Sequence, residues 1–379
     1  MENMSNKVCI LTSVHPPFGT RIFHRQAKSL LKAGYDVTLI AQHDKDETVD
    51  GVIILALPKP KNRFWRMLGT WRAFKLALKQ RAAIYHFHDP ELIPIAVLLK
   101  LFANGKVIYD VHENVKRDIL SKSWLPRTAR GPLSLMYQLT EKLGFPFIDE
   151  IIIAEDSYIE NYRKQNNILA LRNYPMLSFI KESSEVKNSR PTLVYVGGIS
   201  EARGVWELVE SMRLLKPKYE NILLTLVGPV YPASLEEKIR KLLEQFSLQQ
   251  NIHLVGKVKY EEIYTILSRC HIGMGILHPT PNYIESPPTK LFEYMALGLP
   301  VITSNFPLWK EIVEGNNCGL TVDPLNPTEI AGAVEYLIEH PDEARKMGKN
   351  GRKAVMVKYN WEMESKKLIN IYENLLKGK

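Results

Sequence analysis

Short apolar runs alternate with longer amphipathic segments along the whole chain. Runs in the first half lie at residues 8–13, 35–41, 52–57, 83–87, 106–111 and 150–155. Runs in the second half lie at residues 192–198, 222–228, 251–256, 271–277, 300–304 and 319–323. Apolar runs of this length, separated by helix-length segments, are typical of parallel strands joined by crossover helices. The pattern therefore predicts an α/β protein.

The repeating pattern lapses once, at residues 171–191, where polar residues cluster and apolar periodicity is lost. A chain of 379 residues also exceeds what one hydrophobic core usually serves. We therefore interpret this stretch as a linker between two doubly wound, Rossmann-like domains. The predicted domains are residues 1–175 together with a C-terminal helix, 362–379, and residues 176–361.

Charge is distributed unevenly along the sequence. The whole chain carries a net charge of +9, and residues 59–130 hold 15 Lys and Arg residues against 5 Asp and Glu residues. Such a basic region indicates an anionic partner: nucleic acid, a membrane surface or a phosphate-bearing acceptor. A surface that is basic only for solubility is the simpler alternative. Because motifs that read nucleic-acid bases are lacking, we expect no nucleic-acid partner.

The sequence carries no signal for export or for crossing a membrane. No apolar run reaches the roughly 18–20 residues of a membrane-spanning helix. The N-terminus passes directly into a strand-like run without a cleavage site, and the three widely spaced cysteines form neither a disulfide framework nor a zinc motif. We therefore expect a cytoplasmic protein, with a peripheral position at the inner face of the cell membrane as a further option.

Three histidines directly follow predicted strands of the first half: His15 after the first, His88 after the fourth and His112 after the fifth. Ligands of doubly wound sheets bind outside the carboxyl ends of the strands, so these side chains are expected to share one crevice. His88, polarised by the adjacent Asp89, can donate a hydrogen bond to a sugar hydroxyl or to an acceptor. A buried, satisfied histidine is the alternative for His88. His86 is interpreted as structural and is assigned to the opposite face of the strand.

The most informative segment is YIESPPTKLFEYMALGLPVITS, residues 283–304. Pro288 suits the first turn of a helix, and Ser286 can cap that helix. A helix start offers free backbone N–H groups and the positive end of a dipole, and Lys290 adds a full charge. The segment is therefore predicted to bind a diphosphate.

Two glutamates flank this helix start. Glu285, in the preceding loop, can accept hydrogen bonds from sugar hydroxyls, while Glu293, two turns further on, can hold the diol of a ribose. The alternative is that the spacing of the two glutamates is accidental and that Glu293 faces solvent. The Pro-rich turn between them favours a nucleotide-sugar site.

The segment resembles the E-x7-E signature of the family-4 retaining glycosyltransferases. Further blocks resemble that family in the expected order along nearly the whole chain: SVHPPFGTRIFHRQAKSLLKAGYDVTLIA, HFHDPELIP, YDVHEN and LVYVGGISEARGVWELVE. The resemblance implies a GT-B fold, in which two Rossmann-like domains face each other across a cleft. It also implies retention of configuration at the anomeric carbon, no essential metal, and a final helix that crosses back to the first domain near Tyr359–Trp361.

The resemblance also implies roles for individual residues. The residues expected to bind the donor are Gly19, Gly197, Gly198, Arg203, Glu285, Thr289, Lys290, Leu291 and Glu293. The residues expected on the acceptor side are His15, His88, Asp89, His112 and Glu113. The implied catalytic residues are His88, Arg203, Lys290 and Glu285. Gly198 stands where the family usually has an arginine, so Lys290 is expected to compensate for that missing phosphate contact.

No metal or other cofactor is expected, because the nucleotide sugar is a co-substrate. His86, His88 and Asp89 resemble a metal site, but the two histidines are assigned to opposite faces of one strand. The triplet Asp44-Lys45-Asp46 lies in a polar loop without a partner in view. Both metal sites are therefore discounted.

Two basic segments are candidates for contact with an anionic membrane. In residues 58–81, aromatic side chains alternate with Arg and Lys residues at helical spacing, as in helices that lie at membrane interfaces. Residues 116–130 add a second basic patch. The alternative is an apolar stripe that faces the core, with solvated charges beside it.

The sequence thus predicts a retaining glycosyltransferase that moves a sugar from a nucleotide sugar, with UDP preferred, to a hydroxyl of a glycan or lipid-linked acceptor. The resemblance favours synthesis of cell-surface polysaccharide. Two alternatives stay open: a nucleotide-sugar epimerase of the same fold, and a non-catalytic descendant that binds sugars. The Glu285 and Glu293 pair and the acceptor-side blocks favour sugar transfer.

Overall fold

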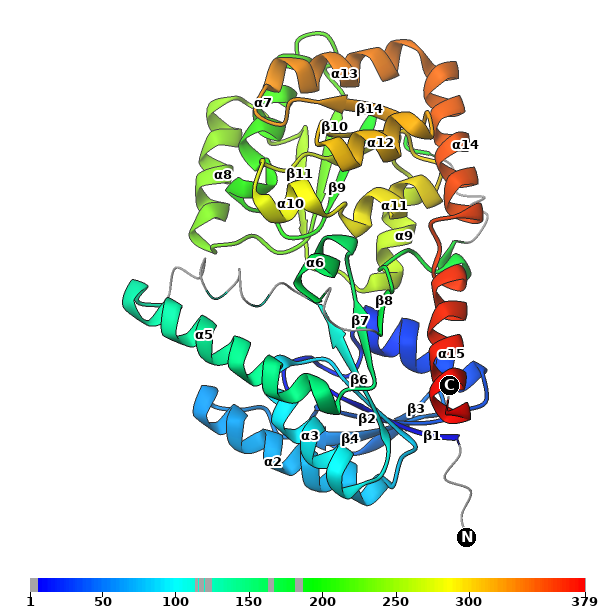
Figure 1. Cartoon of the computed structure of the whole chain (residues 1–379). Coiled ribbons are helices and arrows are strands. Elements are labelled where there is room, and N and C mark those ends of the chain that lie inside the picture. Colours follow the sequence, from blue (N-terminus) through cyan, green and yellow to red (C-terminus); the bar gives the residue numbers. More distant parts are fainter. Residues whose placement is uncertain are drawn as a thin grey trace. The chain divides into compact units, whose positions relative to one another are not determined.

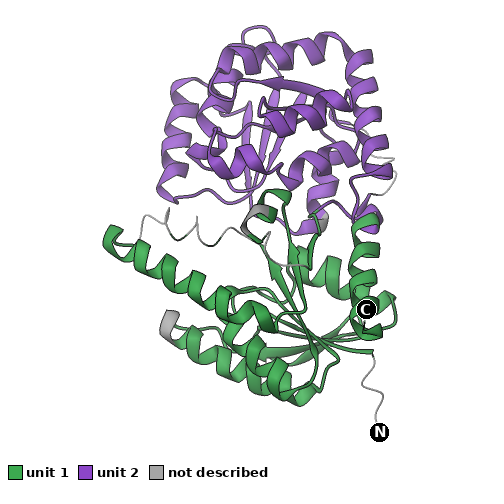
Figure 2. Ribbon diagram, viewed as in Figure 1, with its two compact units in different colours: residues 1–173, 363–379 green, residues 174–362 purple. Residues whose placement is uncertain are grey.

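The structure is a computed structural model of the chain, and it describes residues 6–112, 115, 119, 125–162, 167–180 and 187–378. The chain divides into two compact units (Figure 1, Figure 2). Unit 1 consists of Met1–Asn173 together with Met363–Lys379, and unit 2 consists of Tyr174–Glu362. Each unit is an α/β structure built on its own sheet.

Unit 1 contains an eight-stranded sheet with the order β3-β4-β2-β1-β5-β6-β7-β8. Its strands are β1 (Lys7–Leu11), β2 (Asp36–Gln42), β3 (Glu47–Val49), β4 (Val52–Leu57), β5 (Ile84–Phe87), β6 (Lys106–Val111), β7 (Glu150–Ile153) and β8 (Ile168–Ala170). Neighbouring strands are parallel except β3 and β4, which pair antiparallel. The chain order reverses between β1 and β5, which is where doubly wound sheets bind ligands.

Helices cover both faces of this sheet. The helices of unit 1 are η2 (a π-helix, Thr20–Ala27), α1 (Lys28–Lys32), α2 (Arg63–Gln80), α3 (Ile93–Phe102), α5 (Arg127–Gly144), α6 (Ile159–Tyr162) and α15 (Trp361–Lys377), whose residues from Met363 onward belong to this unit. Helices α2 and α3 pack on the face that carries Tyr85 and Phe87, whereas η2 and α15 contact the opposite face. Short 3-10 turns lie at Pro90–Leu92, Phe145–Phe147 and Asp156–Tyr158.

Unit 2 contains a six-stranded parallel sheet with the order β11-β10-β9-β12-β13-β14. Its strands are β9 (Thr192–Val196), β10 (Leu223–Val227), β11 (Ile252–Gly256), β12 (Ile272–Gly275), β13 (Val301–Ser304) and β14 (Gly319–Val322). Its helices are η6 (Leu177–Phe179), η7 (Glu201–Arg203), α7 (Val205–Leu215), α8 (Ser234–Gln245), α9 (Tyr260–Ser268), α10 (Pro281–Glu285), α11 (Thr289–Ala296), α12 (Pro307–Gly315), α13 (Pro327–Glu339) and α14 (Pro341–Val357). Among the described residues of both units, no helix combines the length and apolar character needed to cross a bilayer.

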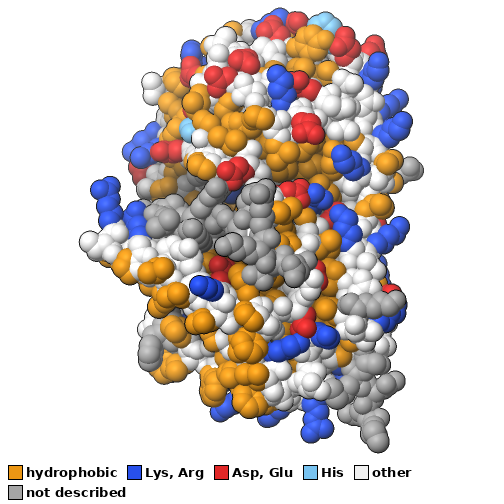
Figure 3. All heavy atoms as spheres, viewed as in Figure 1, with side chains coloured by type: hydrophobic (Ala, Val, Ile, Leu, Met, Phe, Trp, Pro, Cys, Tyr) orange, Lys and Arg blue, Asp and Glu red, His pale blue; other side chains and the backbone are white. Residues whose placement is uncertain are grey.

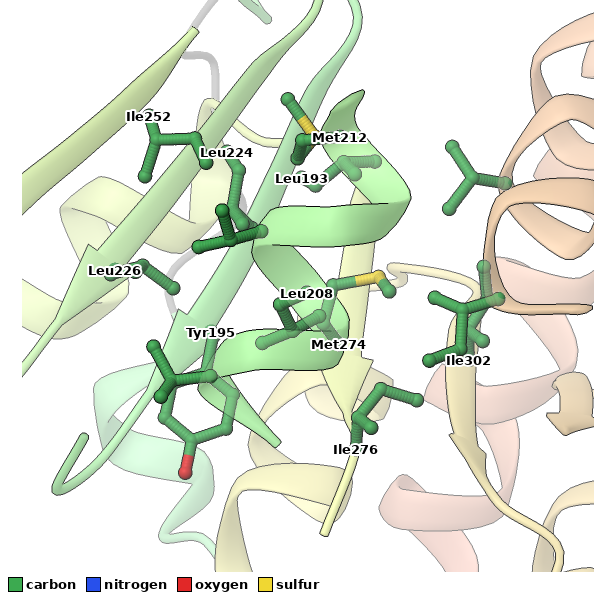
Figure 4. Close-up of a cluster of buried hydrophobic side chains, with 14 of the residues drawn as sticks. Leu193, Tyr195, Leu208, Met212, Leu224, Leu226, Ile252, Met274, Ile276 and Ile302 are labelled. Atoms are coloured by element: carbon green, nitrogen blue, oxygen red, sulfur yellow. The ribbon is translucent and has the colours of Figure 1, made fainter. Parts of the chain in front are cut away.

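All strands predicted from the apolar runs are present, and neither end of any of them differs from the prediction by more than two residues. They were recognisable because strands of a parallel sheet are buried on both faces and read as continuous apolar runs. Figure 4 shows the result in unit 2, where β9, β10, β12 and α7 enclose an apolar core. Strands β3 and β8 were not predicted, since three-residue edge strands carry little apolar signal.

The ends of β9 and β10 approach each other so closely that only glycine fits. A Cβ atom on Gly228 would lie 2.0 Å from the carbonyl oxygen of Gly197, and both residues have positive φ angles, +143° and +125°. Residues with a side chain rarely adopt such backbone angles. This contact fixes the backbone that follows β9, which carries part of the candidate site.

We predict that Gly228→Ala lowers the free energy of unfolding by about 3 kcal/mol or more, because it combines a backbone clash with an unfavourable φ angle. Urea unfolding followed by circular dichroism measures the change. Gly332→Ala is the matched control, since Gly332 lies inside α13 with open space around it. That substitution should stabilise the protein by about 0.5–1 kcal/mol. Equal effects of the two substitutions would contradict the steric argument.

Candidate active site

Asp89 anchors the loop that follows β1. Its Oδ2 atom accepts hydrogen bonds from Thr12 Oγ1 (2.8 Å), Ser13 N (2.6 Å) and Ser13 Oγ (3.3 Å), and the residue is buried. Asp89 follows β5, so it ties together the carboxyl ends of the two strands at which the chain order reverses. The Asp89 carboxylate therefore holds the loop after β1, which carries His15, against the segment that follows β5.

The three histidines predicted to share a crevice do lie together, which confirms that prediction. His88 Nδ1 lies 2.8 Å from His112 Nε2, and the rings of His15 and His112 stack with centroids 5.4 Å apart. His15 Nε2 lies 3.6 Å from Asp89 Oδ1. Glu113, the remaining residue of the predicted acceptor side, lies outside the described residues.

Asp110, in β6, is the centre of the polar network beneath these histidines. It is fully buried and receives two hydrogen bonds from Arg21, Nε to Oδ2 (3.1 Å) and Nη2 to Oδ1 (2.8 Å), and one from Gln26 Nε2 (2.5 Å). Both partners belong to the π-helix η2, in which residues five apart lie on the same side. The unusual helix therefore aims two donors at one carboxylate.

His86 was predicted to face away from His88, and this prediction is wrong. Residues two apart in a strand point to the same face, and the two rings stack with centroids 4.7 Å apart. His86 Nδ1 lies 2.7 Å from the hydroxyl of Tyr372 in α15, and His86 Nε2 lies 3.6 Å from Asp110 Oδ2. The C-terminal helix thus contributes to the histidine cluster.

Corrected in this way, His86, His88 and Asp110 place potential metal-binding atoms within 4.8 Å of one another. Both oxygens of Asp110 are, however, already hydrogen-bonded to the Arg21 guanidinium, which would repel a cation. The arrangement fits a hydrogen-bonded network better than a metal site. The expectation that no metal is needed stays a prediction.

Burial and charge set the ionisation of this network. Burial opposes ionisation of Asp110, but Arg21 and the histidines outweigh it and hold the pKa of the carboxyl well below its usual value. Burial lowers the pKa of His88 well below 6.5, with a smaller contribution from His86. Burial also lowers the pKa of His112 to about 4, against the opposing effect of Asp110. At neutral pH the cluster therefore combines the Asp110 carboxylate with uncharged imidazoles at His88 and His112.

In unit 2, two cationic side chains converge on the backbone after β9. A Cβ atom on Gly197 would lie 3.2 Å from Lys290 Nζ and 3.3 Å from Arg203 Nη1. Lys290 is buried and has no hydrogen-bond partner among the residues that the structure describes, and its Nζ lies 3.4 Å from the centroid of the Tyr195 ring. Burial, reinforced by Arg203 and only partly offset by Glu293, lowers its pKa well below the usual value.

Arg203 has only neutral hydrogen-bond partners. Its Nε donates to the hydroxyl of Tyr283 (3.2 Å), and its Nη1 donates to the carbonyl oxygen of Gly198 (3.4 Å). Within the described part of the chain, neither Arg203 nor Lys290 has a carboxylate within 4.0 Å, although both point at Gly197. Two cations without a neighbouring carboxylate, placed beside a glycine backbone, are an arrangement whose charge a dianion would neutralise.

The helix predicted to hold this anion is α11, and its start differs from the prediction. Pro288, expected in the first turn, is the N-cap residue, and the helix has no side-chain cap, so the expected capping role of Ser286 is wrong. Proline at this position has no N–H to offer, and the first helical residues are Thr289 and Lys290. Leu291 packs in the core below them.

The two glutamates occupy different environments. Glu285 is exposed and ends the short helix α10, so its predicted position in a loop is wrong. Glu293 is buried, with 6% of its surface exposed, and its Oε1 accepts a hydrogen bond from the hydroxyl of Tyr260 (3.3 Å). The alternative that Glu293 faces solvent is therefore excluded. Gly19 lies in unit 1 as the N-cap residue of η2, with a φ of −66° that does not require glycine.

Two family models match this chain. The model described as "Glycosyl transferases group 1" matches residues 178–354, and the model described as "Glycosyltransferase Family 4" matches residues 19–168. The first match lies in unit 2 and includes Gly197, Arg203 and Lys290, and the second lies in unit 1 and includes His88, Asp110 and His112. His15 and Tyr372 lie outside both matches. The chain belongs to the family-4 glycosyltransferases.

Relatives of this glycosyltransferase extend over most of the chain. The putative glycosyltransferase YtcC of Bacillus subtilis is 23% identical over 361 residues, which cover 91% of this chain and 85% of the relative. The structure of a sucrose-phosphate synthase from Thermosynechococcus elongatus has a TM-score of 0.78 and 20% identity, covering 99% of this chain and 100% of that one. The structure of Anabaena HepE in complex with UDP-glucose has a TM-score of 0.73 and 12% identity, covering 97% of this chain and 99% of that one. These likenesses show the GT-B fold.

Several residues of the glycosyltransferase's two clusters were not predicted as site residues: Arg21, Gln26, Asp110, Tyr195, Tyr283 and Tyr372. Asp110 does carry a sequence signal, because a carboxylate inside the apolar run KVIYDV must be buried and paired. The sequence does not indicate which residues pair with Asp110, since Arg21 is 89 residues away from it in the sequence.

We predict that the glycosyltransferase loses stability as the pH falls through the depressed pKa range of His112. Its imidazole binds a proton near pH 6.5 when unfolded but only near pH 4 when folded, so this contribution is complete above about pH 6.5 and decreases toward pH 4. Between about pH 7.5 and pH 5, His112 should account for about 2 kcal/mol of the loss. Urea unfolding at the two pH values measures it. His112→Asn should reduce the difference by that amount, and an unchanged difference would contradict the assignment.

Proposed function

We propose that this chain is a retaining glycosyltransferase that transfers a sugar from a nucleotide sugar, preferably a UDP-sugar, to a hydroxyl of a glycan or lipid-linked acceptor. Unit 2 would bind the donor and unit 1 the acceptor. Synthesis of cell-surface polysaccharide is the process that this activity would serve. The nucleotide sugar is a substrate, and we propose that the reaction needs no metal ion.

The observation that carries this proposal is the convergence of Lys290 and Arg203 on Gly197 without a neutralising carboxylate. A buried ammonium without a partner costs free energy, which a bound anion repays. Glycine leaves the backbone accessible at that point. A diphosphate supplies two negative charges for these two cations, and the structure of HepE, which has the same fold, is a complex with UDP-glucose.

The glutamates fit the two ends of such a donor. Glu293 is buried one turn beyond Lys290 and already accepts a hydrogen bond, as a carboxylate that holds a ribose diol would. Glu285 is exposed at the end of α10, where it can reach a sugar hydroxyl. Thr289 and Lys290 contribute the first backbone N–H groups of α11. These placements support a donor with a nucleoside at one end and a sugar at the other.

The proposed chemistry is electrostatic. The bond between the anomeric carbon and the phosphate oxygen breaks, and its electron pair remains on the diphosphate, where Lys290 and Arg203 stabilise the charge. The acceptor hydroxyl attacks from the same face, and a donor phosphate oxygen takes its proton. We propose that the uncharged imidazoles of His88 and His112 hydrogen-bond to the neutral hydroxyl of the acceptor.

Unit 1 exposes an apolar face with a positive border, which we propose lies on an anionic membrane. Helices α2, α3 and α5 carry nine Lys and Arg residues but a single acidic one, Glu141. Their large exposed side chains are Trp65, Met67, Leu68, Trp71, Leu101, Phe102, Leu135, Met136, Leu139 and Leu143. Figure 3 shows hydrophobic side chains gathered over the lower part of the view, where these helices lie in Figure 1. Most of segment 116–130 lies outside the described residues, and Phe74 of segment 58–81 belongs to the core.

We predict that Lys290→Met reduces turnover by about 10²–10³-fold, because it removes a charge that stabilises the departing diphosphate. The same change should leave the free energy of unfolding equal or higher, since it removes a desolvated ammonium that has no partner. Product formation from a UDP-sugar panel, with thermal unfolding of the same samples, measures both quantities. The matched control is Lys310→Met on α12, an exposed position where activity should not change. Full activity of Lys290→Met would refute the proposed role, and free epimer formed without acceptor would favour an epimerase.

We predict that the double substitution Leu139→Ser and Leu143→Ser lowers binding to anionic vesicles by about tenfold, because two exposed apolar side chains no longer enter the lipid. Co-sedimentation with phosphatidylglycerol vesicles measures binding, and higher salt should weaken it further. Val357→Ser, at an exposed apolar position of unit 2, is the control. Equal binding to neutral vesicles would exclude the proposed surface.

A further inference from the structure

A separate cavity of about 420 Å³ opens in unit 1 beside the start of α2. Its walls are largely apolar and include Leu57, Pro58, Trp65 and Leu68. Gln42 and Ser13 are the polar residues that line it. Four of the lining residues are Lys or Arg, and none is aspartate or glutamate.

Three of those four cations have no acidic partner. Arg66 is neutralised, because its Nε lies 2.8 Å from Glu91 Oε1. Lys59, Lys61 and Arg72 form no ion pair or hydrogen bond with any part of the chain that the structure describes. The cavity therefore combines apolar walls with a net positive charge at its rim.

The cavity is connected to the histidine cluster through Ser13. The Oγ atom of Ser13 donates to Glu91 Oε1 (2.8 Å), and its backbone N–H donates to Asp89 Oδ2 (2.6 Å). Gln42 Nε2 donates to the carbonyl oxygen of Ser13 (2.5 Å). A molecule in the cavity would therefore lie against the loop that Asp89 holds beside His88.

We propose that this cavity binds a phosphate-bearing amphiphile, whose anionic group pairs with Lys59, Lys61 and Arg72 and whose apolar part packs against Trp65, Leu57 and Leu68. A neutral glycan would leave the three cations unpaired, and a small sugar phosphate would leave the apolar walls in water. The further claim that the bound amphiphile is the sugar acceptor rests on the proposed function. The claim that the cavity binds such a molecule does not depend on the proposed function.

The test measures binding of decyl phosphate to the full-length protein by isothermal titration calorimetry, at concentrations below micelle formation. Decyl maltoside supplies the apolar chain without the charge, and glucose 6-phosphate supplies the charge without the chain. Decyl phosphate should bind about tenfold or more tightly than either, because only it satisfies both halves of the cavity. The double substitution Lys61→Gln and Arg72→Gln should remove about tenfold of that affinity.

Lys75→Gln is the matched control, since Lys75 is exposed on the same helix but does not line the cavity. Equal affinity for decyl maltoside would overturn the anionic half of the proposal, and equal affinity for glucose 6-phosphate would overturn the apolar half. Equal losses in Lys75→Gln and in the double variant would show non-specific attraction and overturn the site. UDP binding, measured on the same samples, keeps the two proposals apart: decyl phosphate binding without UDP binding would refute the donor site and leave this cavity standing.

Discussion

Within the described part of the chain, the Lys290 ammonium is enclosed without a hydrogen-bond partner, and the proposed donor site depends on this constraint. Desolvation and the nearby Arg203 both disfavour the charge on Lys290, and the Tyr195 ring and the more distant Glu293 compensate only in part. Beside this ammonium, β9 and β10 meet through Gly197 and Gly228 at a distance that admits no side chain. An unpaired charge next to a backbone without side chains leaves room for the proposed diphosphate.

In the histidine cluster of unit 1, by contrast, the buried charge has a counter-charge within the protein. Asp110 is as deeply buried as Lys290, but its charge is compensated internally by Arg21 and Gln26 from a single π-helix. The carboxylate therefore needs no ligand, and its field acts on histidines that burial keeps uncharged. Unit 1 of the enzyme thus combines uncharged imidazoles with a carboxylate that already has its counter-charge. Unit 2 instead places two cations beside Gly197 with no carboxylate within 4.0 Å of them among the described residues.

Sequence reasoning predicted the parts of this arrangement that local patterns encode. The strands followed from apolar runs, and the meeting of His15, His88 and His112 followed from their places at strand ends. It failed where a rule of geometry was misapplied, as for His86, two residues from His88 and hence on the same face. It also failed where a side chain contacts a residue far away in the sequence. The residues around Arg21 do not predict its partner 89 residues away, and the residues around Tyr372 do not predict its contact with His86.

The basic excess of the chain can now be divided by physical role. The proposed anion site of unit 2 would use two cations, both at least partly buried, so these two residues contribute little to surface charge. The excess instead lies on α2, α3 and α5, where cations border exposed leucines, tryptophans and methionines that a solubilising surface would not need. A surface selected only for solubility would carry charge without those side chains. The same three helices carry apolar area and positive charge, and the cavity beside α2 has the same two properties, so both features match the proposed partner, which is apolar and anionic.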